Sequence, residues 1–488
     1  MVGIEKITRF LPAVEKPTYK QSFNRRIMWT LIALILYLTL SHIGVYGIAS
    51  TPQFEAIVQI QTLLGAKFGS LLTLGIGPIV TSGIILQLLV GSKIINWDMT
   101  KPEGREKFQA WNKFLAVLFC FVEAIAFVIA GNIPIIGGTA IYIFVILQLA
   151  AGGIIVILLD ELVSKWGFGS GVSLFIAAGV ATQIIINVLS PCGPSSMVWL
   201  CKTTTPRGEF VGIFWGFLSN ILLGNNWLAL SYAIPIISTI IIFLLVVYIQ
   251  GIYIPIPLSF TALRGFGRTW SLKLLYTSNI PVILVAALLA NIQLLSRIGL
   301  QETENAFCSF LGCFEKVVQS DGSIIPGNPV SGAVYFLSSP RNFFLDLLSL
   351  VFPNLSPIPF NPLEILRAIT YLLFMVVGCA IFSYFWVNTS GMDPASVAEQ
   401  IDAIGLHIPG YRSDKKIMEN VLRRYIPYLA VLGGIIVGLL AAFADFLGVI
   451  GTGTGILLTV MIIYSYYDEL SMQRSEEMHP IIRKILGE

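Results

Sequence analysis

The chain has 488 residues, of which 56% are hydrophobic and only 12% are charged. About a quarter of the residues of a soluble protein are charged, and a soluble fold of this length could not hide so much apolar surface. The formal net charge of +3 is too small to indicate general nucleic-acid binding. The composition therefore predicts a membrane protein and excludes an ordinary soluble domain.

A polar, basic segment, residues 1–26, precedes the first long apolar stretch. A spanning helix needs about 20 apolar residues, and an open strand cannot satisfy its backbone in lipid. Ten stretches qualify, near residues 27–48, 72–91, 109–130, 140–159, 171–190, 228–250, 274–296, 364–387, 425–443 and 453–470. The sequence thus predicts an all-α membrane protein with ten transmembrane helices, followed by a tail at residues 471–488.

The basic residues indicate on which side of the membrane each loop lies. An even number of spans puts both termini on one side, and most of the 30 Lys and Arg residues fall on that side. Because the more basic side is the cytoplasm, loops 251–273 and 388–424 are expected there, and loops 191–227 and 297–363 outside. The cytoplasmic loops either contact acidic lipid head groups, which these residues alone favour, or dock an acidic partner such as ribosomal RNA.

Residues 52–69, between the first two spans, are too polar to cross lipid. Their apolar side chains nevertheless recur at helical spacing, at Ile57, Ile60, Leu64 and Phe68. The pattern predicts a short amphipathic helix. This helix either lies flat on the bilayer or re-enters the bundle and fills a cavity.

The second and seventh spans share features that indicate two related halves. Each begins near a proline, Pro78 or Pro281, and carries a later glutamine. Proline is tolerated in the first turn of a helix, and repeated halves are common in transport proteins. We therefore divide the spans into a first half, residues 27–190, and a second half, residues 228–470.

The sequence carries no motif for catalysis, a metal or a cofactor. It contains no HExxH, GxSxG or Walker loop, its three histidines lie far apart, and no cysteines form CxxC. Glu123 is the one acid expected well inside a span, whereas Asp160 and Glu161 end the fourth span and are expected to be solvated. The glycine-rich run at 451–455 indicates close helix packing. An enzyme is not expected.

Four of the six cysteines fall in the two outer loops. The outside of a cell permits disulfides, so we predict pairing within each loop, Cys192 with Cys201 and Cys308 with Cys313. Four free thiols remain the alternative. The other two cysteines lie in spans, where they are expected to pack as small apolar groups.

Several segments are similar, in order, to signature sequences of the SecY family. They are residues 73–83 (TLGIGPIVTSG), 160–165 (DELVSK) with 169–171 (GSG), 276–283 (YTSNIPVI), 409–412 (PGYR) and 453–458 (GTGILL). The likeness covers nearly the whole chain and resembles the archaeal and eukaryotic branch most. It is weakest in the two long outer loops.

This resemblance implies the large subunit of a preprotein translocase in the cell membrane, with both termini in the cytoplasm. An hourglass pore would be blocked from outside by a plug helix, here residues 52–69, and a seam between the halves would open toward lipid. The resemblance implies no hydrolysis by the channel itself. Its implied partners are SecE-type and beta-type small membrane subunits in a heterotrimer, a ribosome, indirectly the signal recognition particle receptor, and the translocating polypeptide.

Matching to the family also assigns roles to single residues. A ring of apolar side chains would narrow the pore at Ile76, Val80, Val172, Ile176, Ile283 and Leu458, with Leu457 as the alternative to Leu458. The first four form two pairs at i,i+4, and each pair shares a helix face. A polar seam would comprise Thr81, Glu123 and Asn291. On the basic loops, where phosphate contacts favour arginine, ribosome docking would use Arg264, Arg412, Arg423 and Arg424.

Two other classes of function remain open from the sequence. A secondary transporter of a small solute would need paired charges that face a midplane cavity, and Glu123 is the one acid expected there. A membrane scaffold without a pore would show no conductance even after removal of residues 55–68.

Overall fold

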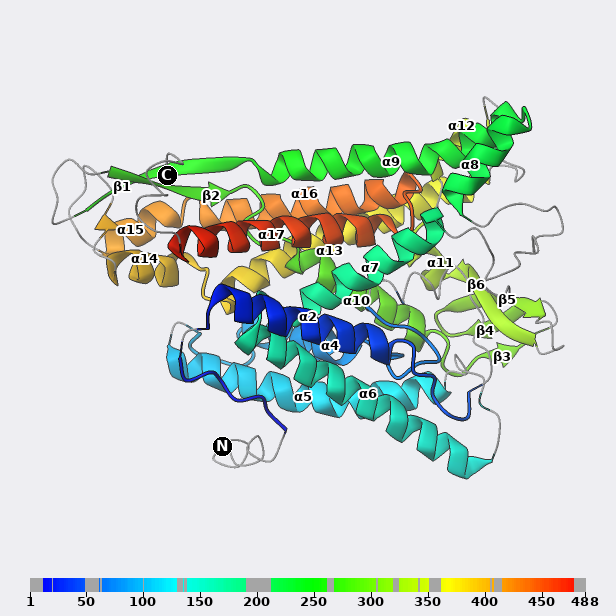
Figure 1. Cartoon of the computed structure of the whole chain (residues 1–488), viewed down its shortest axis with the longest axis horizontal. Coiled ribbons are helices and arrows are strands. Elements are labelled where there is room, and N and C mark those ends of the chain that lie inside the picture. The colour runs from blue at the N-terminus through cyan, green and yellow to red at the C-terminus, as the bar shows by residue number, and fades with distance from the viewer. Residues whose placement is uncertain are drawn as a thin grey trace.

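The computed structural model describes residues 12–19, 21–48, 61, 64–99, 101–129, 135, 138–189, 212–260, 267–303, 306–318, 324–340, 343–350, 361–403, 406–407 and 415–477. Helices dominate this part of the chain (Figure 1). Every expected span contains one: α2 (Phe23–Leu40), α4 (Gly77–Gly91), α5 (Pro102–Ile129), α6 (Thr139–Trp166), α7 (Gly171–Leu189), α9 (Asn226–Gln250), α10 (Ile280–Leu295), α13 (Leu363–Thr389), α16 (Ile426–Phe446) and α17 (Gly453–Glu477). Among the described residues, 7 helices are long and apolar enough to cross a membrane.

The helices form two groups that meet along the middle of the molecule. Figure 1 shows α2, α4, α5 and α6 on one side and α9, α16 and α17 on the other. The groups join where α10 packs on α4 and α5, and where α17 packs on α7. One hydrophobic cluster continues through both groups.

Glycine allows the closest of these helix contacts. The helices α13 and α16 make the most extensive contact in the bundle. A Cβ atom on Gly434 of α16 would lie 2.6 Å from the carbonyl oxygen of Cys379 on α13, and one on Gly438 would lie 2.9 Å from that of Met375. Small residues serve this purpose in membranes, because helix association there depends on close packing.

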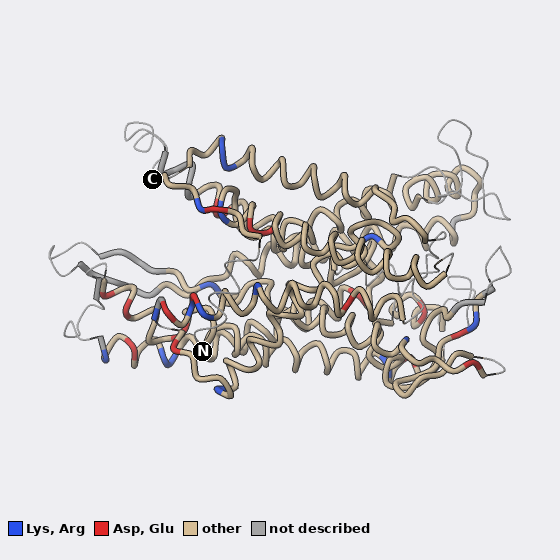
Figure 2. The backbone as a smooth tube through the Cα atoms, turned by 90° about the horizontal axis from the view of Figure 1, so that it is seen from below, with Lys and Arg blue, Asp and Glu red and all other residues tan. Residues whose placement is uncertain are grey.

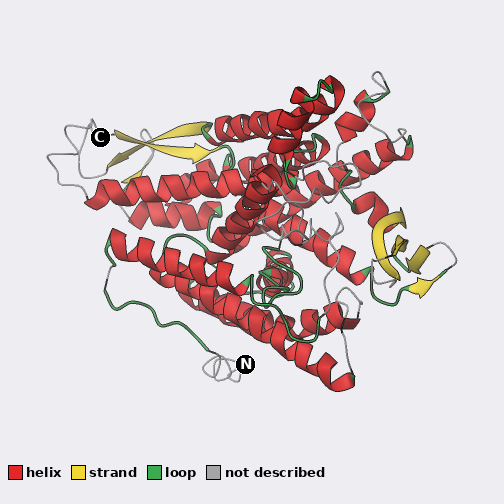
Figure 3. Ribbon diagram, turned by 45° about the vertical axis from the view of Figure 1, so that its right-hand side comes forward, coloured by secondary structure: helices red, strands yellow, loops and turns green. Residues whose placement is uncertain are grey.

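Two small sheets lie at opposite ends of the bundle (Figure 3). One has the strand order β2-β1-β7, and the other β3-β4-β5-β6. The sequence analysis treated both regions as loops. Strands are possible there because they lie beyond the spans, where water satisfies the open sheet edges that lipid could not. Their bounds are β1 (Tyr253–Phe260), β2 (Gly267–Lys273), β7 (Leu406–His407), β3 (Gln301–Glu302), β4 (Ala306–Ser309), β5 (Gly312–Val318) and β6 (Ile324–Gly332).

Short helices occupy parts of the connecting segments. Between α7 and α9, the helix α8 packs on α9, where Gly216 leaves room for the ring of Tyr232. The indole of Trp215 on the same helix donates to the carbonyl oxygen of Leu189 at 3.0 Å. The bounds of these helices are α8 (Ile213–Leu222), α11 (Ala333–Leu337), α12 (Phe343–Leu348), α14 (Pro394–Ala403) and α15 (Lys415–Leu422).

Charged residues gather mainly at the end of the bundle that carries the β1–β2 hairpin, and the middle is largely free of them (Figure 2). At this end Asp160 and Glu161, which were expected to be solvated, are partly exposed and also bond to protein groups. Glu161, whose side chain is 17% exposed, lies 2.5 Å from Lys113 Nζ. Asp160 accepts the backbone N–H of Val172 at 2.9 Å and thereby caps α7. Both acids are partly covered because α6 continues to Trp166 and brings them against α5 and α7.

The sequence predicted a short amphipathic helix over residues 52–69, but the chain is not helical at residues 64–69. Ile57 and Ile60 lie outside the described residues. Leu64 and Phe68 are described, and they lie in turns. The cause is local: Gly65 and Gly69 have φ angles of +54° and +85°, which a right-handed helix does not use.

Candidate functional site

A chain of side-chain hydrogen bonds crosses three helices in the apolar interior. The hydroxyl of Thr81 on α4 donates to Oε1 of Glu123 on α5 at 2.8 Å. The amide nitrogen of Asn291 on α10 donates to the same hydroxyl at 3.0 Å. The structure therefore brings the three polar seam residues together, and Thr81 uses both its donor and its acceptor. The contact to Asn291 joins the two groups of helices.

Glycine makes room for the carboxyl group of this chain. Glu123 is only 8% exposed. A Cβ atom on Gly77, in the first turn of α4, would lie 2.7 Å from its Oε2. A carboxyl group is costly inside a membrane unless polar groups surround it. Gly77 thus lets Glu123 approach the end of α4 that also carries Thr81.

The six residues assigned to the pore ring pack in one hydrophobic cluster. Ile76 directly precedes α4, Val80 lies on α4, and the others come from α7, α10 and α17. Five of the side chains are buried, and Val172 is half-buried. The cluster therefore draws ring residues from both groups of helices. Leu457, the alternative to Leu458, is also buried in it.

The turns at residues 64–69, at the end of the amphipathic segment, contact this cluster. The backbone N–H of Ile76 donates to the carbonyl oxygen of Leu64 at 2.9 Å. Phe68 packs edge-to-face on Phe127 of α5 with 5.2 Å between ring centroids. The hydroxyl of Tyr37 donates to the carbonyl oxygen of Gly65. Residues 64–69 thus contact Ile76 of the cluster, Phe127 of α5 and Tyr37 of α2.

A second buried acid was missed by the sequence analysis. Asp445 is 5% exposed and accepts a hydrogen bond from the hydroxyl of Tyr371 at 2.7 Å. It also accepts the backbone N–H groups of Gly453 at 2.8 Å and Thr454 at 3.3 Å, and so caps α17. The expected span ended at residue 443, but α16 continues to Phe446 and keeps Asp445 inside. The close packing expected of the glycine-rich run is present, because a Cβ atom on Gly453 would lie 2.1 Å from the nitrogen of Asp445.

The remaining predicted residues that the structure describes lie at the two ends of the bundle. Arg423 and Arg424 are exposed in the turn after α15, whereas Arg264 and Arg412 lie outside the described residues. On the other side, a disulfide joins Cys308 and Cys313 across the β4–β5 pair. Cys192 and Cys201 lie outside the described residues, so their pairing stays a prediction.

Comparison with known sequences identifies related chains. Residues 70–467 match the family model described as SecY. The chain is 41% identical to the protein translocase subunit SecY of Pyrococcus furiosus, and the match covers 99% of this chain and 98% of that protein. It is 40% identical to the Methanocaldococcus jannaschii protein of the same name, with 98% of each chain covered.

Solved structures of the same type resemble the fold. One, described as the structure of a protein conducting channel, has a TM-score of 0.77 at 39% identity and covers 98% of this chain and 99% of that chain. Another is Sec61 in a canine ribosome-channel complex, with a TM-score of 0.72 at 37% identity and the same coverage of 98% and 99%. These likenesses confirm the helical channel fold expected from the sequence. Together with the family match over most of its length, they establish that the chain belongs to the SecY family.

Proposed function

We infer that the chain is the central pore-forming subunit of a preprotein translocase, which conducts secretory polypeptides across a membrane and releases membrane helices sideways into lipid. One observation carries this inference. Apolar side chains from both groups of helices pack in one cluster, and Thr81, which directly follows the cluster residue Val80, accepts a hydrogen bond from Asn291 that joins those groups. A pore for polypeptides needs such a deformable constriction, and a lateral exit needs a contact that can separate.

The physical chemistry of the constriction suits a channel that passes chains but blocks ions. Apolar side chains exclude water from a narrow pore, and an ion cannot cross without its water. A polypeptide can displace the same side chains, because they make no directional bonds. The buried turn at residues 64–69 would act as the end of a plug that moves away when a chain enters. No catalytic group is required, and hydrolysis would be left to a partner.

The polar seam would serve as the lateral gate. Hydrogen bonds between membrane helices contribute only about 1 kcal/mol each. A contact of that strength, such as the one between Thr81 and Asn291, favours the closed arrangement and still yields to an entering signal helix. Glu123 would hold Thr81 in the orientation that accepts from Asn291.

Partners and location follow from charge and from relatives. We propose a cell-membrane protein with both termini in the cytoplasm, because the basic loops mark the cytoplasmic side. One similar solved structure is of Sec61 in a ribosome-channel complex. A ribosome on the cytoplasmic loops, SecE-type and beta-type small subunits and an indirect link to the signal recognition particle receptor are proposed accordingly.

A transporter of a small solute is the second candidate, and the buried acids argue against it. Such a transporter needs charged groups that face a central cavity. Of the two buried acids named here, Asp445 is occupied with the capping of α17. Of the buried acids among the described residues, Glu123 then remains for ion coupling.

Reconstitution separates these functions directly. The chain is purified in mild detergent with its bound small subunits and placed in vesicles. We expect two small single-span proteins to copurify, and the vesicles to take up a secretory precursor into a protease-protected form. Uptake of any member of a panel of radiolabelled solutes, with no protection of the precursor, would instead identify a transporter.

Charge reversal at Arg423 and Arg424 should weaken ribosome binding. Both side chains are exposed at one cytoplasmic tip, and each lost phosphate contact lowers the salt dependence of log K by roughly one unit. The measurement is cosedimentation of ribosomes with proteoliposomes over a series of salt concentrations. Lys107→Glu on α5 is the matched control, since Lys107 is also exposed but lies on another element. If the double variant keeps the wild-type affinity and salt slope, these arginines contact lipid and not the ribosome.

A further inference from the structure

The outer sheet is attached to α10 through a buried arginine. Arg297 lies two residues after the end of α10 and is only 3% exposed. Its guanidinium donates to the carbonyl oxygens of Pro326 at 3.3 Å and Gly327 at 3.0 Å, both on β6. It also lies 5.0 Å from the centroid of the Phe314 ring on β5. Burial lowers the pKa of Arg297 to about 10, so the group is still charged at neutral pH.

An irregularity in the sheet provides the acceptors for Arg297. The pairing between β5 and β6 shifts register on either side of Phe314. A β-bulge leaves backbone groups out of the ladder. Gly327 has no partner in the β5–β6 register, and its carbonyl oxygen accepts from the arginine, as does that of the neighbouring Pro326, which pairs with Lys316. Glu315 fixes the next residue by accepting from the backbone and side-chain nitrogens of Asn328. The sheet is thus shaped to hold the outer end of α10.

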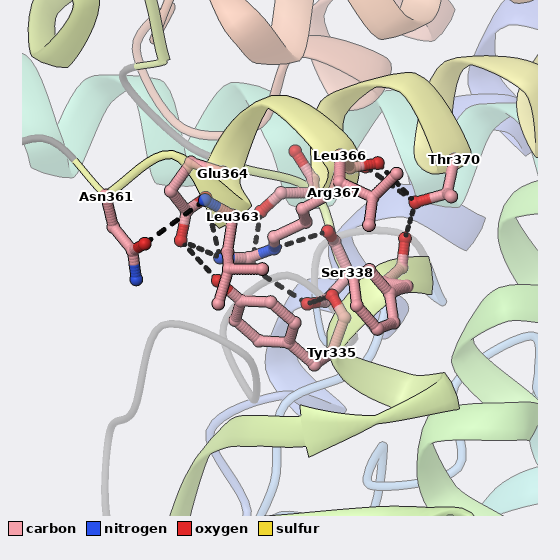
Figure 4. Close-up of polar contacts among 10 residues, drawn as sticks. Tyr335, Ser338, Asn361, Leu363, Glu364, Leu366, Arg367 and Thr370 are labelled. Atoms are coloured by element: carbon pink, nitrogen blue, oxygen red, sulfur yellow. Dashed lines mark hydrogen bonds and ion pairs between the residues drawn. The ribbon is translucent and has the colours of Figure 1, made fainter.

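The segment that follows this sheet, α11 and the residues just after it, is attached to α13 through a second arginine (Figure 4). Arg367 donates to the carbonyl oxygens of Ser338 at 3.0 Å and Ser339 at 3.1 Å, just after α11. It lies 4.7 Å from the ring centroid of Tyr335 and 3.3 Å from a carboxylate oxygen of Glu364. The hydroxyl of Tyr335 donates to that carboxylate group at 2.7 Å.

The sheet and α11 form one connected unit. The helix α11 follows β6 directly, and the backbone N–H of Val334 donates to the carbonyl oxygen of Leu311 in the β4–β5 turn at 3.2 Å. Where β6 ends, Gly332 packs so closely on Gly312 that a Cβ atom would lie 2.4 Å from its Cα. The two arginines therefore bond to the same unit, one from the end of α10 and the other from α13.

We propose that the outer module, β3–β6 with α11, is a brace, and that Arg297 and Arg367 are positioning residues that hold the outer ends of α10 and α13 together. The helices would then move as one body when the seam between α10 and the α4–α5 pair opens. This inference rests on the proposed function of that seam. Bonds to a charged donor are roughly twice as strong as neutral ones, so the single neutral contact of Asn291 separates before the brace does.

Distances between spin labels test the brace. Labels on unnatural side chains replace Leu295 and Leu366, which are 55% and 49% exposed at the outer ends of α10 and α13. A second pair of labels replaces Leu295 and Ile129, and Ile129 lies on α5 and is 64% exposed. A synthetic signal peptide with a leucine core should lengthen the second distance and leave the first unchanged. In Arg297→Met and in Arg367→Met, the distribution of the first distance should broaden from the single narrow peak of the wild type.

A matched control lies on the same sheet. Lys316 pairs with Glu302 at 2.8 Å and lies 5.5 Å from the Phe307 ring, but these partners belong to the sheet and not to α10 or α13. Lys316→Met should keep the wild-type distances. Arg297→Lys should give a distribution of the first distance that is narrower than that of Arg297→Met. Formation of the disulfide between Cys308 and Cys313, read by mass spectrometry, checks that each variant still folds its sheet.

The outcomes separate the brace from the proposed function. An unchanged first distance in both arginine variants overturns the brace, and so does its lengthening in the wild type when the peptide binds. If the arginine variants respond as expected but wild-type vesicles protect no precursor, the brace stands and the translocase function fails. If the precursor is protected but the first distance is the same in the wild type and in both arginine variants, only the brace fails.

Discussion

Serine at the pore ring should turn the closed channel into one that leaks ions. The ring residues pack in a single apolar cluster, from which water is excluded. Each polar substitution lowers the free energy of wetting by roughly 1 kcal/mol, and about 1.4 kcal/mol is a factor of ten, so the combined variant with six substitutions should pass well over about tenfold more ions. Conductance in planar bilayers, without ribosome or precursor, measures this. The positions are Ile76, Val80, Val172, Ile176, Ile283 and Leu458.

A single matched pair on α4 separates pore wetting from general destabilisation. Val80 and Leu86 are 6% and 2% exposed, but only Val80 belongs to the cluster that holds the ring. Val80→Ser should raise the conductance, whereas Leu86→Ser should not. An equal conductance in both single variants, or a combined variant as tight as the wild type, would show that these side chains do not form the constriction.

The sequence predicted the polar seam because polar residues stand out in apolar spans. Thr81, Glu123 and Asn291 lie on three helices that are distant in the chain, and the structure joins them by two hydrogen bonds. Their selection depended on family likeness, since spacing alone cannot show which faces of three helices meet. What spacing did establish was the shared face of residues such as Ile76 and Val80.

The sequence could not predict features that depend on backbone detail. The amphipathic segment does not remain helical to residue 69, because Gly65 and Gly69 have positive φ angles, and composition does not fix a dihedral angle. Asp445 was missed because apolar periodicity locates a helix end only to within a few residues. Arg297 was missed because its acceptors are backbone carbonyl oxygens of β6, and one of them, on Gly327, lies at an irregularity in strand pairing.

Opposite shifts should follow from two substitutions of Asn291 at the seam. Either one removes the bond to Thr81, which contributes about 1 kcal/mol to the closed arrangement. Leucine adds apolar surface that opening would expose to pore water, and full burial of such a side chain is worth about 1.5–3 kcal/mol. Asn291→Leu should therefore favour closure and require more hydrophobic signal sequences. Asn291→Ala loses the bond without that gain and should accept less hydrophobic ones.

These shifts are measured with precursors of graded signal hydrophobicity in reconstituted vesicles. The threshold is the signal hydrophobicity at which half of the chains become protease-protected. Glu123→Gln is the control at the other end of the hydrogen-bond chain, because glutamine keeps an oxygen that can accept from Thr81. It should move the threshold less than Glu123→Ala does, since alanine leaves the hydroxyl without that acceptor. Gly77→Ala, which would press on the Glu123 carboxyl group, should shift it as Glu123→Ala does. If both Asn291 variants shift the threshold in the same direction, or neither shifts it, the balance of hydrogen bonding and burial at Asn291 does not set the gate.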